Sequence, residues 1–266
     1  MLTIRLEALR GLQFDAIEQQ ICAAPGFRYI AVDAMEEADV KAFAIVLLRL
    51  FRKGKHYLIR SAAALAKVLG HVDNRPLLSR EELISAESKT GGMVIVGSHV
   101  KKTTTQLDCL REASVPMAWI EFHVDAWAEE GGLAAETARA IALAEEAMQA
   151  GRTAVVYTSR RLLVPEGASP EELLALSVRI SEALTAVVSG LHFQPRFLIA
   201  KGGITSSDVG TKGLHDTRAM VAGQVQPGIP VWKTGPESRF PGLSYIIFPG
   251  NVGAVDTLRT IVETLA

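Results

Sequence analysis

Short apolar runs alternate along the chain with longer segments in which apolar residues recur at helical spacing. The run from Met93 to Val96 is continuous and rich in β-branched residues, as is typical of a buried strand. Between Glu36 and Arg52 apolar residues recur every three or four positions, which predicts an amphipathic helix. The same patterns predict strands at 27–33, 56–60, 93–96, 117–124, 153–158, 196–200 and 244–248, and helices at 36–52, 61–69, 103–113, 133–149, 171–189, 205–212 and 252–265.

This alternation of strands and helices predicts an α/β fold. We expect a largely parallel or mixed sheet flanked by helices in Rossmann-like layers, with a smaller N-terminal α/β segment. From Gly70 to Gly92 the alternation is interrupted by polar and turn-forming residues. We therefore expect a boundary near residue 88, which separates a segment at 1–88 from a domain at 89–266.

Three predicted strands of the second domain end at glycine-containing loops that lead into a helix. These loops are Gly97-Ser98-His99, Lys201-Gly202-Gly203-Ile204-Thr205 and Pro249-Gly250-Asn251. Glycine lets the backbone approach a ligand closely, and the free N–H groups at a helix start attract anions. Because neighbouring parallel strands bring such loops to one sheet edge, the pattern predicts an anion or nucleotide site. The two best-known nucleotide-binding motifs are absent, so the spacing alone does not identify ATP.

Other polar residues near these loops leave alternatives open. Lys201 is a candidate to neutralise phosphate charge, but it also fits a surface lysine at a strand end. Asp208 fits either a carboxylate beside a metal or a solvated helix residue. The stretch Tyr157–Arg161 follows another predicted strand and is a further source of hydrogen-bond donors.

Composition and charge exclude several classes of protein. Apolar residues make up 48% of the chain, charged residues 21%, and the net charge is −1. This is the balance of a globular protein, without the basic excess of most nucleic-acid-binding domains. No apolar run reaches the roughly 18 residues that a membrane helix needs, and no signal-peptide core follows Met1. We therefore expect a cytoplasmic protein that binds neither nucleic acid nor membranes.

Five motifs, in their order along the chain, resemble those of the four-carbon acid sugar kinase family. They are Val96-Gly97-Ser98-His99 with Lys102-Thr103-Thr104-Thr105-Gln106-Leu107, Tyr157-Thr158-Ser159-Arg160, Lys201-Gly202-Gly203-Ile204-Thr205-Ser206-Ser207-Asp208, Gln226-Pro227-Gly228-Ile229-Pro230-Val231-Trp232, and Phe248-Pro249-Gly250-Asn251-Val252-Gly253. The resemblance covers essentially the whole chain. It implies an ATP-dependent kinase that phosphorylates tetronates or oxo-tetronates, with ATP and Mg²⁺ as cofactors. It also implies ATP contacts at these positions: Ser98, Gly202, Gly203, Ile204, Thr205 and Gly250.

Members of that family begin with a substrate-binding domain that an Asp-Asp-type motif opens, and this sequence has no such motif. The resemblance therefore assigns 1–88 to the tail of that domain and 89–266 to the nucleotide-binding domain. A shortened chain, a split gene product and a damaged gene remain alternatives. We expect the chain to bind ATP but to be inactive alone, with its catalytic base unassigned. The expected partners are a sugar acid and either a second copy or a separate N-terminal domain.

Two other functions remain open. One is a non-catalytic module that binds a nucleotide or a phosphate-bearing ligand. The other is an inert remnant in which the glycine loops are only turns.

Overall fold

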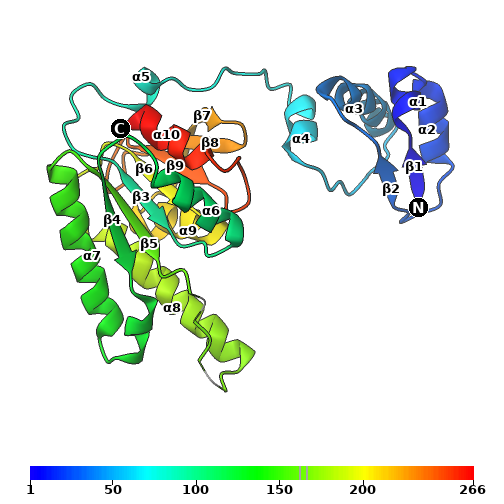
Figure 1. Ribbon diagram of the computed structural model, residues 1–266. Helices are drawn as coiled ribbons and strands as arrows, with labels where there is room; N and C mark the ends of the chain where they lie inside the picture. The colour runs from blue at the N-terminus through cyan, green and yellow to red at the C-terminus, as the bar shows by residue number, and fades with distance from the viewer. Residues whose placement is uncertain (162, 166) are drawn as a thin grey trace. The chain divides into compact units, whose positions relative to one another are not determined.

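The computed structural model of the chain describes residues 1–161, 163–165 and 167–266. These residues form two compact units, Met1–Arg75 and Pro76–Ala266, which we call unit 1 and unit 2 and describe separately (Figure 1). Among the described residues, no helix has the length and apolar character that crossing a membrane requires. A cytoplasmic location stays a prediction, as does the assignment of residues 1–88 to a substrate-binding domain.

Unit 1 is a small α/β arrangement around one apolar cluster. Its strands β1 (Leu2–Ile4) and β2 (Ile30–Val32) pair in parallel. Its helices are α1 (Leu6–Arg10), α2 (Phe14–Cys22), α3 (Glu37–Arg52) and α4 (Ala63–Leu69). The helix predicted at 36–52 is confirmed as α3, and its buried face contributes Ala42, Val46 and Leu50 to the cluster. The predicted smaller N-terminal α/β segment is therefore present.

The first turn of α3 is held by a buried carboxylate. Asp39 accepts hydrogen bonds from the backbone N–H groups of Met35 and Glu36, each at 2.9 Å. Arg10 of α1 donates to both oxygens of the same carboxylate, at 2.9 and 3.2 Å. The Arg10 guanidinium and these N–H groups hold the pKa of Asp39 well below its usual range. Asp39 thus links the N-terminus of α3 to α1.

The strand predicted at 56–60 is wrong. The structure has no regular element there, and the Leu58 side chain is fully exposed. Tyr57 packs against the apolar cluster of unit 1, whereas its apolar neighbours Leu58 and Ile59 are exposed. A strand forms only where a neighbour supplies hydrogen bonds and an apolar surface, and the sequence pattern alone does not test for either.

Unit 2 contains a seven-stranded sheet with the order β4-β5-β3-β6-β9-β8-β7. The strands are β3 (Met93–Val96), β4 (Met117–Phe122), β5 (Thr153–Thr158), β6 (Leu198–Lys201), β7 (Ala219–Gln226), β8 (Ile229–Thr234) and β9 (Ser244–Phe248). In the described residues β4, β5, β3, β6 and β9 run parallel, and β8 runs antiparallel to both β9 and β7. The sheet is therefore mixed, with a large parallel part, as predicted.

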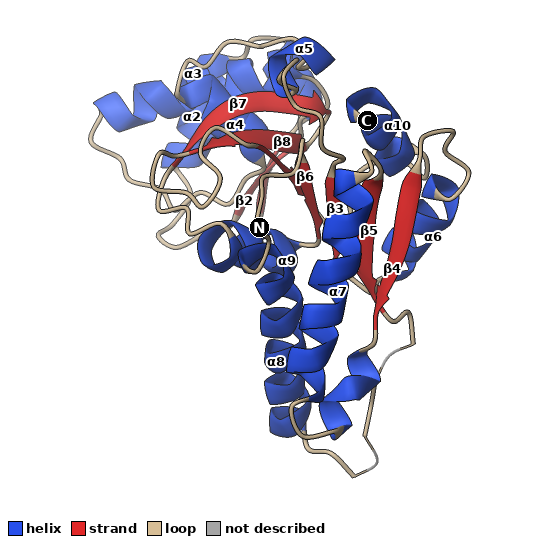
Figure 2. Ribbon diagram, turned by 90° about the vertical axis from the view of Figure 1, so that its left-hand side faces the viewer, coloured by secondary structure: helices blue, strands red, loops and turns tan. Residues whose placement is uncertain are grey.

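Helices cover both faces of this sheet (Figure 2). One face packs against α7 (Gly132–Gln149), α8 (Pro170–Ser189), the short helix α9 (Gly203–Asp208) and the π-helical turn η2 (Val209–Gly213) that continues it. The other face packs against α5 (Arg80–Leu83), α6 (Lys101–Leu110) and α10 (Thr257–Leu265). A 3₁₀ turn, η1 (Val124–Ala128), follows β4. The layered, Rossmann-like α/β fold predicted from the sequence is confirmed.

The hairpin formed by β7 and β8 is absent from the predicted elements. Pro227 and Gly228 form its turn, and Gly228 has a φ of +77°, which glycine adopts without strain. β7 lies at the sheet edge, is only partly buried, and shows register shifts at Val221/Gly223 and Gln224/Gln226. These irregularities break the strict alternation by which an edge strand is recognised in a sequence.

Asp216, shortly after η2, is a buried carboxyl group near the loop that joins β8 to β9. Neither of its oxygens makes a hydrogen bond of normal geometry among the described residues. Burial raises its pKa, Glu237 raises it further, and Ser238 and the Gly235 backbone oppose the rise only in part. Because the folded state holds this proton more tightly than the unfolded state, the free energy of unfolding falls as the pH rises from about 4 through the folded pKa.

We therefore predict that Asp216→Asn stabilises unit 2 at pH 7. The amide has nearly the same shape but carries no charge to desolvate, so the gain should be on the order of 1 kcal/mol. Urea unfolding of both proteins between pH 3 and 8 measures the effect. The two curves should converge at the acid end, where Asp216 is neutral in both states. A constant difference across this pH range would contradict the explanation.

Candidate functional site

The three glycine loops predicted from the sequence begin at the same level of the sheet. β3, β6 and β9 are adjacent, and they pair in parallel with Val96 opposite Lys201 and Lys201 opposite Phe248. The final residues of the three strands are thus in register. The loops that follow, 97–100, 202–203 and 249–256, therefore leave the same carboxyl edge side by side.

Ser98 lies where these loops meet. Its hydroxyl is 3.1 Å from the Thr103 hydroxyl, which is also 3.3 Å from the backbone carbonyl oxygen of Gly250. A Cβ atom on Gly202 would lie 3.2 Å from the Ser98 Cβ, and one on Gly250 would lie 3.4 Å from the Ser98 Oγ. The structure therefore brings Ser98, Gly202 and Gly250 together, although they are far apart in sequence.

Two glycines are required by the close approach of backbone segments. Gly202 has a φ of +127°, which L residues with a side chain rarely adopt. A Cβ on Gly97 would lie only 2.3 Å from the hydroxyl oxygen of the buried Thr205. Thr205 thus packs beneath the loops, where it fills the space between Gly97 and Gly202.

Gly203 and Ile204 face the opposite way, toward solvent. A Cβ added to Gly203 would meet no described atom within 4 Å, and the Ile204 side chain is 74% exposed. The site therefore has a closed base at Thr205 and an accessible rim at residues 203 and 204. The free backbone of Gly203 leaves room for a ligand to approach the first turn of α9.

Lys201 is completely buried, so the interpretation as a surface lysine is wrong. Its ammonium group donates to the carbonyl oxygens of Pro249 and Gly250, at 2.8 and 3.3 Å, and lies 3.8 Å from the centre of the Phe248 ring. Burial, together with a smaller contribution from the nearby Lys102, lowers the pKa of Lys201 to about 7. Lys201 therefore connects the end of β6 to the loop after β9 and places a buried positive group beside it.

Arg160, just after β5, fixes the first loop from the other side. It donates to the Ser98 carbonyl oxygen at 2.8 Å and to the Thr104 hydroxyl at 2.8 and 3.3 Å. Burial lowers the pKa of its guanidinium, because the charged form is partly desolvated. The stretch after β5 thus supplies donors to this group of loops, and they are directed at the Ser98 loop itself.

α6 holds the loop after β9, a role that the sequence analysis did not assign. The Gln106 amide donates to the carbonyl oxygens of Val252 and Ala254, at 3.1 and 2.8 Å. Lys102 donates to the Asn251 carbonyl oxygen at 3.1 Å. Residues 102, 103 and 106 occur at helical spacing, so the sequence shows that they share one face of a helix. It does not show that this face contacts the loop after β9.

The residues described here do not gather into a group of three or more metal-binding side chains. Asp208, considered as a carboxylate beside a metal, instead accepts a hydrogen bond from Ser181 at 3.0 Å and lies 3.4 Å from the Lys212 ammonium. The protein part of the site is thus composed of backbone groups, hydroxyls and a buried lysine.

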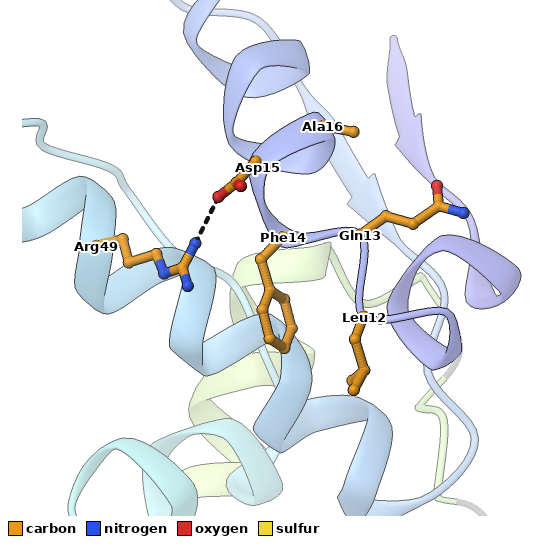
Figure 3. A pocket seen from close by; sticks show the side chains of 6 residues that line it. All are labelled: Leu12, Gln13, Phe14, Asp15, Ala16 and Arg49. Carbon is orange, nitrogen blue, oxygen red and sulfur yellow. Dashed lines mark hydrogen bonds and ion pairs between the residues drawn. The ribbon is translucent and has the colours of Figure 1, made fainter.

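Unit 1 contains a separate hollow of about 180 Å³, lined by Leu12, Gln13, Phe14, Asp15, Ala16 and Arg49 (Figure 3). Its two charged side chains point toward each other, with Arg49 2.8 Å from Asp15, and Arg49 also lies over the Phe14 ring. Because these charges satisfy each other, we do not place the functional site there.

Comparison with known proteins agrees with the class of fold and site. Residues 93–258 match the family model described as the nucleotide-binding C-terminal domain. The chain therefore belongs to this nucleotide-binding family, and the resemblance drawn from its motifs is confirmed. No curated protein sequence matches the chain.

Three solved structures share the fold at low identity. A Salmonella typhimurium LT2 protein named as a candidate tRNA synthase has a TM-score of 0.60 and 19% identity, over 98% of this chain and 57% of that protein. Haemophilus influenzae protein HI1011, of the DUF1537 family, has a TM-score of 0.56 and 18% identity, over 99% and 60%. A DUF1537 domain from Bordetella bronchiseptica, a domain-swapped dimer with bound citrate, has a TM-score of 0.51 and 20% identity, over 99% and 58%. The chain thus spans less than two thirds of the length of these proteins.

We predict that Thr103→Val destabilises unit 2 by about 1–2 kcal/mol, because it removes the hydroxyl between Ser98 and the Gly250 carbonyl while keeping the shape of the side chain. Urea unfolding measures the change. Thr105→Val is the matched control, since Thr105 is exposed and, among the described residues, its hydroxyl bonds to the Lys101 carbonyl oxygen of its own helix. Equal stability losses in the two variants would show that the bridge between the loops contributes nothing.

Proposed function

We propose that this chain binds ATP, with the phosphates over the three converging loops. The single observation that carries the proposal is the contact of Ser98, Gly202 and Gly250 beside the open backbone of Gly203. Backbone N–H groups and hydroxyls arranged in this way suit phosphate oxygens, and Lys201 adds positive charge close by. The proposed contacts are Ser98, Gly202, Gly203, Ile204, Thr205 and Gly250. The family match supports a nucleotide in general, and ATP is the more specific proposal.

The side chains near the loops also indicate which groups would hold the proposed Mg²⁺. Magnesium in phosphate sites keeps several waters and takes one or two carboxylates together with phosphate oxygens. Asp208 has a hydroxyl donor and a lysine as partners, which does not favour it as a ligand. We therefore propose that ATP brings Mg²⁺ with it, held mainly by phosphate oxygens and water. The ion would supply neutralisation of phosphate charge.

We further propose that a protein containing this chain transfers the ATP phosphate to a four-carbon sugar acid. The support is the resemblance of five motifs to the four-carbon acid sugar kinase family, together with the nucleotide-binding domain. Phosphoryl transfer depends on positioning and charge neutralisation, which the loops are suited to provide. We propose self-association as well, because the similar Bordetella domain is described as a domain-swapped dimer.

A non-catalytic nucleotide-binding module is the second candidate function. It is favoured by the site itself, because the converging residues Ser98, Gly202 and Gly250 suit phosphate and carry no carboxylate or imidazole that could take the proton of an acceptor hydroxyl. The loops form one wall of a site, and an acceptor hydroxyl must be held opposite that wall for transfer.

We predict that the 266-residue chain binds Mg²⁺·ADP and that Gly203→Val abolishes this binding. A Cβ atom at Gly203 would meet no described atom within 4 Å, so the variant should fold while its side chain blocks the approach to the loops. Isothermal titration calorimetry measures affinity. Nucleotide at a hundredfold excess over its dissociation constant should also stabilise the native chain by about 2.7 kcal/mol.

Gly26→Val is the matched control for that experiment. Gly26 also has open space around its Cβ position and lies in unit 1. It should leave ADP affinity unchanged. If Gly203→Val folds by circular dichroism and still binds ADP with native affinity, the phosphates do not lie at residue 203.

We predict that the chain alone binds nucleotide without phosphorylating threonate, erythronate or their oxo derivatives. Correct orientation of an acceptor can lower a barrier by about 7–11 kcal/mol, and the site described here offers only the nucleotide side. Coupled detection of ADP release over a panel of four-carbon acids measures transfer. Turnover near 1 s⁻¹, at the low end for kinases, would show that these 266 residues are sufficient and would exclude the non-catalytic module.

A further inference from the structure

We propose that the exposed apolar side chains of Leu174, Val178 and Ile204 form the surface on which the nucleobase of the bound nucleotide rests. We call these three residues the apolar shelf. The inference rests on the proposed nucleotide function, which it extends from the phosphates to the base.

One face of α8 carries the residues discussed below along most of the length of the helix. Residues 174, 178, 181, 185 and 188 follow one another at intervals of four, three, four and three, so their side chains project from the same side of the helix. Ser181, Thr185 and Val188 are the part of this face that touches α9 and η2. Leu174 and Val178 extend the same face toward the N-terminus of α8.

Contacts between α8 and the α9–η2 segment fix which residues of the two lie at the same level. Ser181 donates to Asp208 at 3.0 Å, and a Cβ on Gly213 would lie 3.3 Å from Val188 and 3.6 Å from Thr185. Ser181 contacts residue 208, and the later residues Thr185 and Val188 contact the later residue 213. The α8 helix and the α9–η2 segment therefore run in the same direction. Val178 is one turn before Ser181, and Ile204 is about one turn before Asp208. The register therefore places Val178 at the level of Ile204.

The exposed fraction of the side chains on this face rises toward the N-terminus of α8. Thr185 and Val188 are 3% and 0% exposed, whereas Val178 and Leu174 are 47% and 67% exposed. Both ribbon views show the N-terminal half of α8 extending away from the sheet and beyond α9 (Figures 1 and 2). Aliphatic side chains therefore remain exposed at the point where this helix passes the phosphate-compatible loops.

The final step concerns the ligand. Ile204 directly follows Gly203, so the path past the Ile204 side chain toward α8 is open to the sugar and base of a nucleotide whose phosphates lie at residues 202 and 203. Leu174 and Val178 are about 6 Å apart along α8, a length that suits one purine ring system. Nucleotide sites commonly hold the flat, weakly polar base between apolar side chains. A base on the apolar shelf would cover side chains that otherwise face water.

The test compares two ligands that differ in the base. Isothermal titration calorimetry with Mg²⁺·ADP and with inorganic tripolyphosphate is carried out on the native chain, on Ile204→Ser and on Leu174→Ser/Val178→Ser. These positions are exposed, so the variants should fold, and circular dichroism checks this. Ile204→Ala serves as a milder second variant. Met220→Ser is the matched control, because Met220 is an exposed apolar residue at the start of β7, near the amino end of the parallel strands.

We expect the shelf variants to bind ADP about tenfold more weakly, since they lose apolar contact with the base, and we expect Leu174→Ser/Val178→Ser to bind tripolyphosphate as the native chain does. Met220→Ser should match the native chain with both ligands. Native affinity of the shelf variants for ADP would overturn the proposal, and so would an equal loss for both ligands. A native chain that binds tripolyphosphate and ADP equally well would overturn the apolar shelf but leave the phosphate site intact. A native chain that binds neither ligand would overturn the nucleotide function itself.

Discussion

The candidate site depends on the parallel pairing of β3, β6 and β9. Val96, Lys201 and Phe248 lie side by side as the last residues of these strands, so the chain turns into a loop at the same level three times. A shift of β6 by one residue would turn Lys201 to the opposite face of the sheet and move Gly202 away from Ser98. The register is fixed by strands that are buried on both faces, such as Met93–Val96, and the apolar core therefore also determines the geometry of the polar edge.

Polar contacts then hold the loops against one another. Lys201 and Thr103 both bond to the carbonyl oxygen of Gly250, and Arg160 bonds to that of Ser98. These donors come from a strand, a helix and a strand end, so the loops after β3 and β9 are each restrained by an element that does not belong to them. Such restraint matters for a ligand site, because a loop that is already ordered loses less entropy when a ligand binds.

The sequence predicted the parts of this fold in which local pattern and tertiary environment agree. The continuous apolar run at Met93–Val96 is a buried strand, and the helix predicted at 171–189 is α8. The three glycine loops were found because each follows such a strand. Strand order was not predictable, because nothing local specifies that β9 lies beside β6. The burial of Lys201 was missed for the same reason, since the carbonyl oxygens that accept its hydrogen bonds lie 48 and 49 residues away.

The edge of the sheet has a further consequence. β7 is an outer strand, and an outer strand offers unpaired backbone groups to which another chain can add. Here the preceding segment already occupies part of that edge, because the Leu78 N–H donates to the Gln224 carbonyl oxygen at 2.8 Å and the Leu78 side chain lies against Gly223. The register shifts of β7 also interrupt its ladder. The segment that enters unit 2 thus protects this edge from intermolecular strand pairing and aggregation.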